Sequence, residues 1–153
     1  MKSKLELKKE LYNQCSNFIE HRLLAIKSTI NDIQESLDSE TKSSAGDKHE
    51  TGRAMLQLDR EKLGQQLAGI QKLKQELLKV NIETVSKKVF LGSVVYTSQH
   101  NYFIAISAGE LSYKSEKFYA ISFLTPIAKV LLTKEVGDLI EFGNSTFAIT
   151  KIM

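Results

Sequence analysis

An apolar seam in the first half constrains the fold of this chain more than any other feature. No proline or glycine occurs between Leu5 and Leu37. Within that stretch, apolar residues recur at alternating spacings of four and three, at Ile19, Leu23, Ile26, Ile30, Ile33 and Leu37. A mean spacing of about 3.5 residues is the a/d pattern of a coiled-coil helix. We therefore predict one long helix whose apolar stripe packs against a second helix.

A second heptad pattern supplies the partner helix. Between about residues 51 and 80, apolar residues lie one heptad apart at Leu56, Leu63, Ile70 and Leu77. The intervening residues 38–50 are rich in Ser, Thr, Gly, Asp and Lys, which is typical of turns and helix caps. Two such helices fold back on one another, so we predict an antiparallel coiled-coil hairpin over residues 1–82. Gly64 and Gly69 each weaken the second helix by up to about 1 kcal/mol against Ala, and they also offer room for close helix approach.

The second half changes to the two-residue period of strands. Pro126, the only proline, is expected to open a short helix over residues 126–132, because proline is favoured at the first helical position. Strands around one short helix make a small domain, so we predict an α+β fold with a C-terminal domain over residues 83–153. The expected strands cover residues 89–97 (with a kink at Gly92), 101–107, 118–123, 139–142 and 146–152.

Composition excludes several classes of function. The 153 residues carry a net charge of only +3 with no dense basic block, so any contact with RNA is expected to be indirect, through a protein partner. Cys15 is the only cysteine, which excludes an intrachain disulfide and a cysteine-cluster zinc site. The chain shows neither an apolar signal-peptide core at its start nor a run of membrane-spanning length. We expect a cytoplasmic monomer without membrane association.

Two acids mark the expected hairpin tip, residues 44–50. Asp47 and Glu50 lie three residues apart at a helix start and therefore share one face. Magnesium takes oxygen ligands, often only one or two of them from a protein, so this pair suits a shared Mg²⁺. The same spacing is that of a capping box, in which Asp47 caps the helix and Glu50 returns a bond to its amide. Spacing alone favours the cap and leaves both interpretations open.

Basic residues interleave with these acids. Lys48, His49 and Arg53 are candidates for contacts with RNA or with an acidic partner surface, or they form a solvated polar turn. His49 lies between the two carboxylates and would tune their charge near neutral pH.

Several motifs together carry a family resemblance. Gly46-Asp47-x-x-Glu50 lies between the two helices, and the order and spacing of the motifs extend over nearly the whole chain. The second half contributes Gly92-Ser93-Val94-Val95, Ile121-Ser122-x-x-Thr125-Pro126-Ile127-Ala128, Leu132-x-Lys134-x-x-Gly137-Asp138 and Phe147-x-Ile149-x-x-Ile152. In this combination the chain resembles the bacterial transcript cleavage factors of the GreA/GreB family.

The resemblance implies a fold, a partner and a mechanism. In that family an FKBP-like C-terminal domain docks at the rim of the secondary channel of RNA polymerase. The segment matching its docking motif here is Thr125, Pro126 and Ile127, and Leu124, where the family has a polar residue, is expected to dock with them. The hairpin enters the channel, where the carboxylates matching Asp47 and Glu50 act as catalytic residues by helping to hold the polymerase's second Mg²⁺. The polymerase's own active site then cuts backtracked RNA, so the factor is not itself an enzyme.

The chain diverges from the family pattern at the tip. Lys48 stands where the family usually has Leu, and Thr51 where it usually has Asn. A regulator that enters the channel without promoting cleavage would have these features. A further alternative is a coiled-coil adaptor that dimerises through the heptad seam.

Overall fold

The structure is a computed structural model that describes residues 2–42 and 47–153, and the side chains of residues 2–3, 40–42 and 47–50 lie outside this description. The chain forms two compact units. One comprises Met1–Phe18 and Gln75–Met153, and the other comprises Ile19–Lys74. Both ends of the region expected to form the hairpin, residues 1–82, therefore belong to the unit that holds the sheet.

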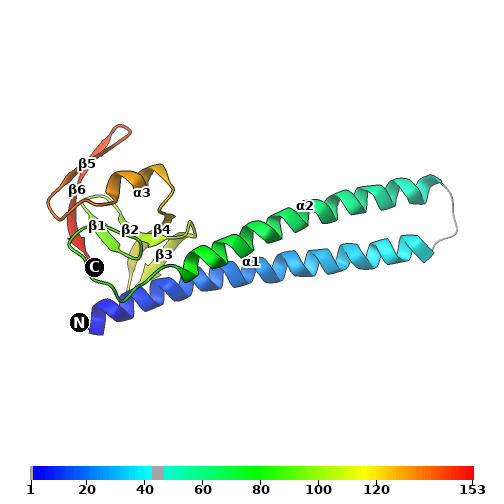
Figure 1. Cartoon of the computed structure of the whole chain (residues 1–153), viewed down its shortest axis with the longest axis horizontal. Coiled ribbons are helices and arrows are strands. Elements are labelled where there is room, and N and C mark those ends of the chain that lie inside the picture. The colour runs from blue at the N-terminus through cyan, green and yellow to red at the C-terminus, as the bar shows by residue number, and fades with distance from the viewer. Residues whose placement is uncertain (1, 43–46) are drawn as a thin grey trace. The chain divides into compact units, whose positions relative to one another are not determined.

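Two long helices form the first half. Helix α1 is Lys2–Lys42 and helix α2 is Asp47–Leu78, and within the unit Ile19–Lys74 they run antiparallel (Figure 1). The Lys74 ammonium forms a salt bridge of 3.2 Å with the Glu20 carboxylate across the pair. Four seam residues of this unit are buried: Ile19, Leu23, Leu37 and Ile70. The predicted hairpin is thus confirmed.

The two glycines in the middle of α2 do not bring the helices closer together. A Cβ added at Gly64 or at Gly69 would meet no atom within 4 Å. The expectation that these residues make room for close approach is therefore wrong. What remains is their helix propensity, which is about 1 kcal/mol below that of alanine.

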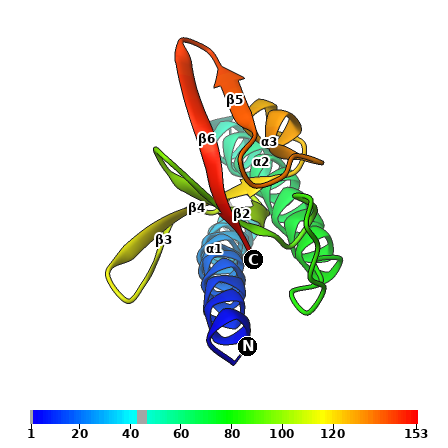
Figure 2. The same cartoon turned by 90° about the vertical axis from the view of Figure 1, so that its left-hand side faces the viewer.

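The other unit contains a mixed six-stranded sheet in the order β3-β4-β2-β1-β6-β5. Figure 2 shows β3 beside β4 and β5 beside β6. Strands β2 and β4 are parallel, and all other neighbours are antiparallel. The one short helix, α3, is Pro126–Leu131. These elements confirm the predicted α+β class. The strands are β1 Val94–Thr97, β2 Asn101–Ala105, β3 Gly109–Tyr113, β4 Glu116–Ser122, β5 Leu139–Phe142 and β6 Ser145–Ile152.

Each face of the sheet has its own apolar layer. On one face, Ile104 and Ile140 belong to a buried cluster with Ala128 and Leu131 of α3. Side chains alternate along a strand, so Phe103, which is fully buried, faces the opposite side. The apolar side chains on this second face must also be shielded from water. The start of α1 belongs to the same unit and has buried apolar residues.

The start of α1 is tied to the sheet edge by a side-chain amide. Gln14 donates from Nε2 to the Ser112 carbonyl at 2.7 Å and accepts from the Ser112 amide at 3.1 Å. The side chain of Gln14 therefore pairs with edge strand β3 as a neighbouring strand would. Nearby on α1, Leu7, Leu11 and Cys15 are buried. Burial raises the pKa of the Cys15 thiol to about 12, so this cysteine stays protonated and acts as a packing residue.

The strand expected over residues 89–97 begins only at Val94. Gly92 adopts a φ of +100°, and a Cβ there would lie 2.5 Å from the Asn81 carbonyl oxygen. The Ser93 hydroxyl accepts a hydrogen bond from the Phe90 amide at 3.0 Å. Residues 90–93 thus form a tight turn and not the kinked strand that we predicted.

Strand β3 was not predicted from the sequence. Only Leu111 of its five residues is buried, because the strand lies at the sheet edge. A strand with one inward side chain lacks the alternation that marks a half-buried strand.

Within the described residues, no helix is both long enough and apolar enough to cross a membrane.

Candidate functional site

The predicted tip acids lie at the start of α2. Helix α1 ends at Lys42 and α2 begins at Asp47, so Asp47 and Glu50 occupy its first turn. The positive end of the helix dipole favours ionised carboxylates there by about 0.3–1 kcal/mol. The side chains of these acids, and those of Lys48 and His49, lie outside the described part of the structure, as do residues 43–46. Their roles at a metal stay predictions.

The donor set of the tip fits a magnesium ion that is shared with a second protein. Asp47 and Glu50 offer carboxylate oxygens, which are the ligand type that Mg²⁺ prefers, and two are fewer than a dedicated site supplies. Among the residues that the structure describes, no group of three or more His, Cys, Asp or Glu side chains is placed to hold a metal.

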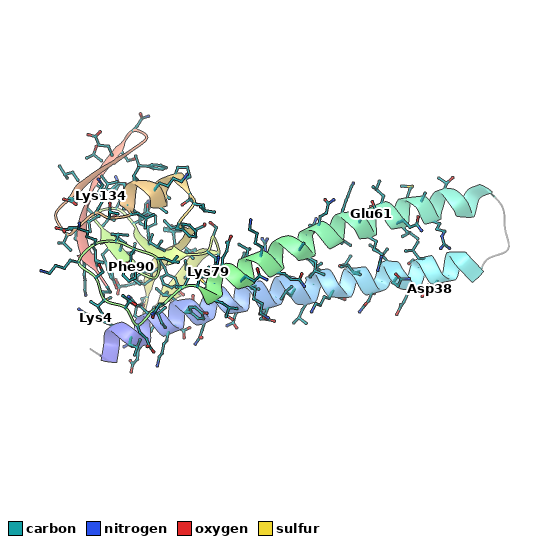
Figure 3. All side chains as sticks on the ribbon, in the orientation of Figure 1. Lys4, Asp38, Glu61, Lys79, Phe90 and Lys134 are labelled. Carbon is teal, nitrogen blue, oxygen red and sulfur yellow. The ribbon has the colours of Figure 1, made fainter. Side chains whose placement is uncertain are left out.

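Arg53 is the one predicted tip residue whose side chain is described. It lines a polar groove of about 450 Å³ together with Asp38, Arg60 and Glu61. Asp38 on α1 and Glu61 on α2 lie on facing helices (Figure 3). The Gln34 amide donates to the Asp38 carboxylate at 3.2 Å. Two guanidinium groups thus balance two carboxylates, and the groove is polar without a strong net charge.

The predicted docking segment forms a braced turn before α3. Thr125 is the N-cap of the helix: its hydroxyl accepts from the Ala128 amide at 3.3 Å and donates to the Ser122 carbonyl at 2.8 Å. The Ser122 hydroxyl in turn accepts from the Leu124 amide at 3.2 Å. Pro126 follows at the first helical position, where its missing N–H costs no hydrogen bond. The local sequence therefore fixes the backbone of this segment.

The four docking residues divide into two pairs. Thr125 and Ile127 are half-buried, and Ile127 packs against the core cluster under α3. Leu124 is 57% exposed, and Pro126 is also exposed. Only Leu124 and Pro126 thus offer most of their surface to a partner, whereas the other two hold the turn in place.

The cap can be tested by its effect on stability. We expect Thr125→Ala to lower the free energy of unfolding by about 1 kcal/mol, because the first turn of α3 loses its side-chain acceptor. Thr125→Ser keeps the hydroxyl and should change stability by only a few tenths of that amount. Urea denaturation followed by circular dichroism measures both variants. Equal stability of Thr125→Ala and Thr125→Ser would contradict the capping role.

The exposed apolar residues of the hairpin that the sequence did not single out include Met55 and Leu58. Met55 is 65% exposed and Leu58 is 52% exposed, and both lie on α2 outside the seam defined by Leu56 and Leu63. Their position in the sequence could have identified them, because apolar residues outside the heptad seam do not face the other helix of the hairpin. They are candidates for contacts with another molecule.

Comparisons with known proteins give the following. No protein-family profile matches this chain, and no curated protein matches it. Among solved structures, the GreA factor homolog 1 (Gfh1) of Thermus thermophilus matches at 16% identity with a TM-score of 0.38, covering 88% of this chain and 92% of that one. A second structure, of the transcription factor Gfh1, matches at 16% identity with a TM-score of 0.34 and covers 94% of each chain.

Proposed function

We propose that this chain is a transcription elongation factor that binds the secondary channel of RNA polymerase and promotes cleavage of backtracked RNA. The observation that carries the proposal is the order of its parts. A helical hairpin has Asp47 and Glu50 in the first turn of its second helix, and it is followed by an α+β sheet unit with Thr125-Pro126-Ile127 at the start of a short helix. This is the motif order that the GreA/GreB resemblance predicts.

The tip acids have the central role in this proposal. A bound Mg²⁺ would supply a Lewis acid for phosphodiester hydrolysis. Asp47 and Glu50 would share that ion with the polymerase, and their place at a helix N-terminus would keep them ionised. The chain's contribution is therefore to carry two charged oxygen ligands on a stiff support, while the bond is broken in the polymerase's own site.

The docking turn has a different role. Since Thr125 and Ile127 are used within the fold, Leu124 and Pro126 are the residues that we expect to touch the polymerase. A turn whose backbone is fixed in advance loses little entropy on binding. This supports docking through the exposed side chains of Leu124 and Pro126.

Polymerase binding tests the docking proposal. We expect Leu124→Asp to weaken binding to the organism's own RNA polymerase by about tenfold or more, because a central apolar contact would be replaced by a charge. Leu78→Asp is the matched control, since Leu78 is 72% exposed at the end of α2. Co-purification followed by a quantitative binding assay measures both. Absence of binding by the unaltered chain would refute the proposed function.

A second candidate function is a channel regulator that does not promote cleavage. It is favoured by the tip itself, where Lys48 and Arg53 stand close to the two acids in sequence. The third hypothesis, an adaptor that dimerises through the seam, has less support. The residues Leu23, Leu37 and Ile70 that would form its interface are already buried within the hairpin.

A further inference from the structure

A pocket in the sheet-bearing unit has no part in the proposed function. Its volume is about 410 Å³, which falls in the usual range of small-molecule sites, roughly 300–1,000 Å³. Three segments far apart in the chain form it: the start of α1, the loop after α2 and the end of β6. Its apolar lining comes from Leu5, Ile82, Val85, Ile152 and Met153, and its charged lining from Lys4, Lys8 and Glu83.

Lys8 is the unusual member of this lining. The residue is only 2% exposed, although lysine is rarely buried without a charged partner. Its ammonium donates to the Thr84 carbonyl at 3.4 Å, which is longer than the usual limit of about 3.2 Å. Among the residues that the structure describes, this is its only hydrogen bond. An ammonium has three donors, so two of them have no hydrogen-bond partner among the described residues.

The surroundings of Lys8 favour an anion. Burial lowers the pKa of Lys8, and the like charge of Lys4, one helical turn away, lowers it further. Lys4 lies near the start of α1 (Figure 3) and lines the same pocket. Glu83 also lines it, but within the described residues it forms no ion pair with either lysine. A bound carboxylate would offset both the desolvation of Lys8 and its repulsion by Lys4.

We propose that this pocket binds a medium-chain carboxylate. The carboxylate would accept hydrogen bonds from the Lys8 ammonium, and the alkyl chain would lie against Leu5, Val85 and Ile152. The apolar lining favours ligands with a long alkyl chain, because each buried methylene strengthens binding by about fourfold. The Lys8 ammonium favours a carboxylate over an uncharged head group, because a hydrogen bond between two charged groups is among the stronger polar contacts. Neither a short acid nor an uncharged alcohol would use both parts of the site.

The test is a titration of the full, isotopically labelled chain with sodium decanoate, kept below the concentration at which it forms micelles. Chemical shifts of residues 4–8, 82–85 and 152–153 should change together in a saturable way. Decanol and acetate should each bind at least about tenfold more weakly than decanoate. Equal binding of decanol and decanoate would overturn the proposal, because the pocket would then not recognise the anion.

Two neighbouring lysines provide a matched pair of variants. Lys8→Met keeps the length of the side chain and removes the charge, so decanoate affinity should fall about tenfold or more. Lys9→Met alters an exposed lysine that does not line the pocket, so affinity should stay within twofold. Circular dichroism confirms that both variants fold. Unchanged affinity in a folded Lys8→Met variant would overturn the proposal.

A second pair of variants changes an exposed residue of the pocket lining and an exposed residue outside it. Val85 is 81% exposed, so Val85→Asp should fold normally while placing a negative charge at the pocket. We expect decanoate affinity to fall about tenfold by charge repulsion. Leu139→Asp is the control, because Leu139 is 71% exposed and lies on β5, away from the lining. Equal losses in both variants, or no loss in Val85→Asp, would contradict the assignment.

Discussion

Replacement of Asp47 or Glu50 by alanine is expected to reduce stimulated cleavage of backtracked RNA by about a hundredfold or more. Under the proposed function, each change would remove an oxygen ligand from a Mg²⁺ shared with the polymerase, and loss of one preorganised electrostatic contact typically costs that much in rate. The measurement is the rate of transcript shortening by stalled polymerase from the same organism. Polymerase binding should be unaffected, because the docking turn is unchanged.

The control for this experiment is an acid on the same helix. Asp59 is an exposed residue of α2 beyond the tip, so Asp59→Ala should leave cleavage within twofold of the unaltered protein. The isosteric changes Asp47→Asn and Glu50→Gln should behave like the alanine variants if charge is what matters. If the unaltered protein binds polymerase but does not stimulate RNA cleavage, the proposed cleavage function is wrong. That result would favour the channel regulator that does not promote cleavage.

Gly92→Ala is expected to lower the free energy of unfolding by about 3 kcal/mol or more. A φ of +100° is unfavourable for a residue with a side chain, which costs about 1–3 kcal/mol. The new Cβ would also lie 2.5 Å from the Asn81 carbonyl oxygen, so the backbone on one side must move. Since a domain is stable by only about 5–15 kcal/mol, this is a large fraction of its stability. Urea denaturation gives the value directly.

Gly109→Ala separates the cost of a positive φ from the cost of the close contact with Asn81. Gly109 also has a positive φ, +80°, but a Cβ there would meet no atom within 4 Å. We expect this variant to lose only the conformational part, about 1–3 kcal/mol. The difference between the two variants then measures the contact of Gly92 with Asn81. Equal destabilisation would show that this contact adds nothing.

Much of the fold was predictable because its signals are local. The seam from Ile19 to Leu37 has a period that only a helix satisfies, and α1 spans it. Pro126 marked the start of α3 correctly, since its fixed φ and missing N–H suit a first helical residue. The β5–β6 hairpin was also found, because apolar alternation flanks a glycine turn.

The docking segment was predictable in position but not in the division of its roles. Motif order placed Leu124, Thr125, Pro126 and Ile127 together. It did not say which side chains hold the turn and which are exposed. That depends on Ser122, whose hydroxyl and carbonyl both bond to the segment, and on the core that lies beneath Ile127.

By itself, the sequence determined the helical hairpin, the α+β class and the candidate acids at the tip, because periodicity and capping act between residues close in the chain. Only the tertiary structure decided which glycine lacks room for a Cβ, how edge strand β3 is paired, and where Lys8 is buried. Gly92 meets Asn81, Gln14 pairs with Ser112, and Lys8 contacts Thr84. Each of these contacts joins segments that are brought together by burial of apolar surface, which is non-directional and leaves no local pattern in the sequence.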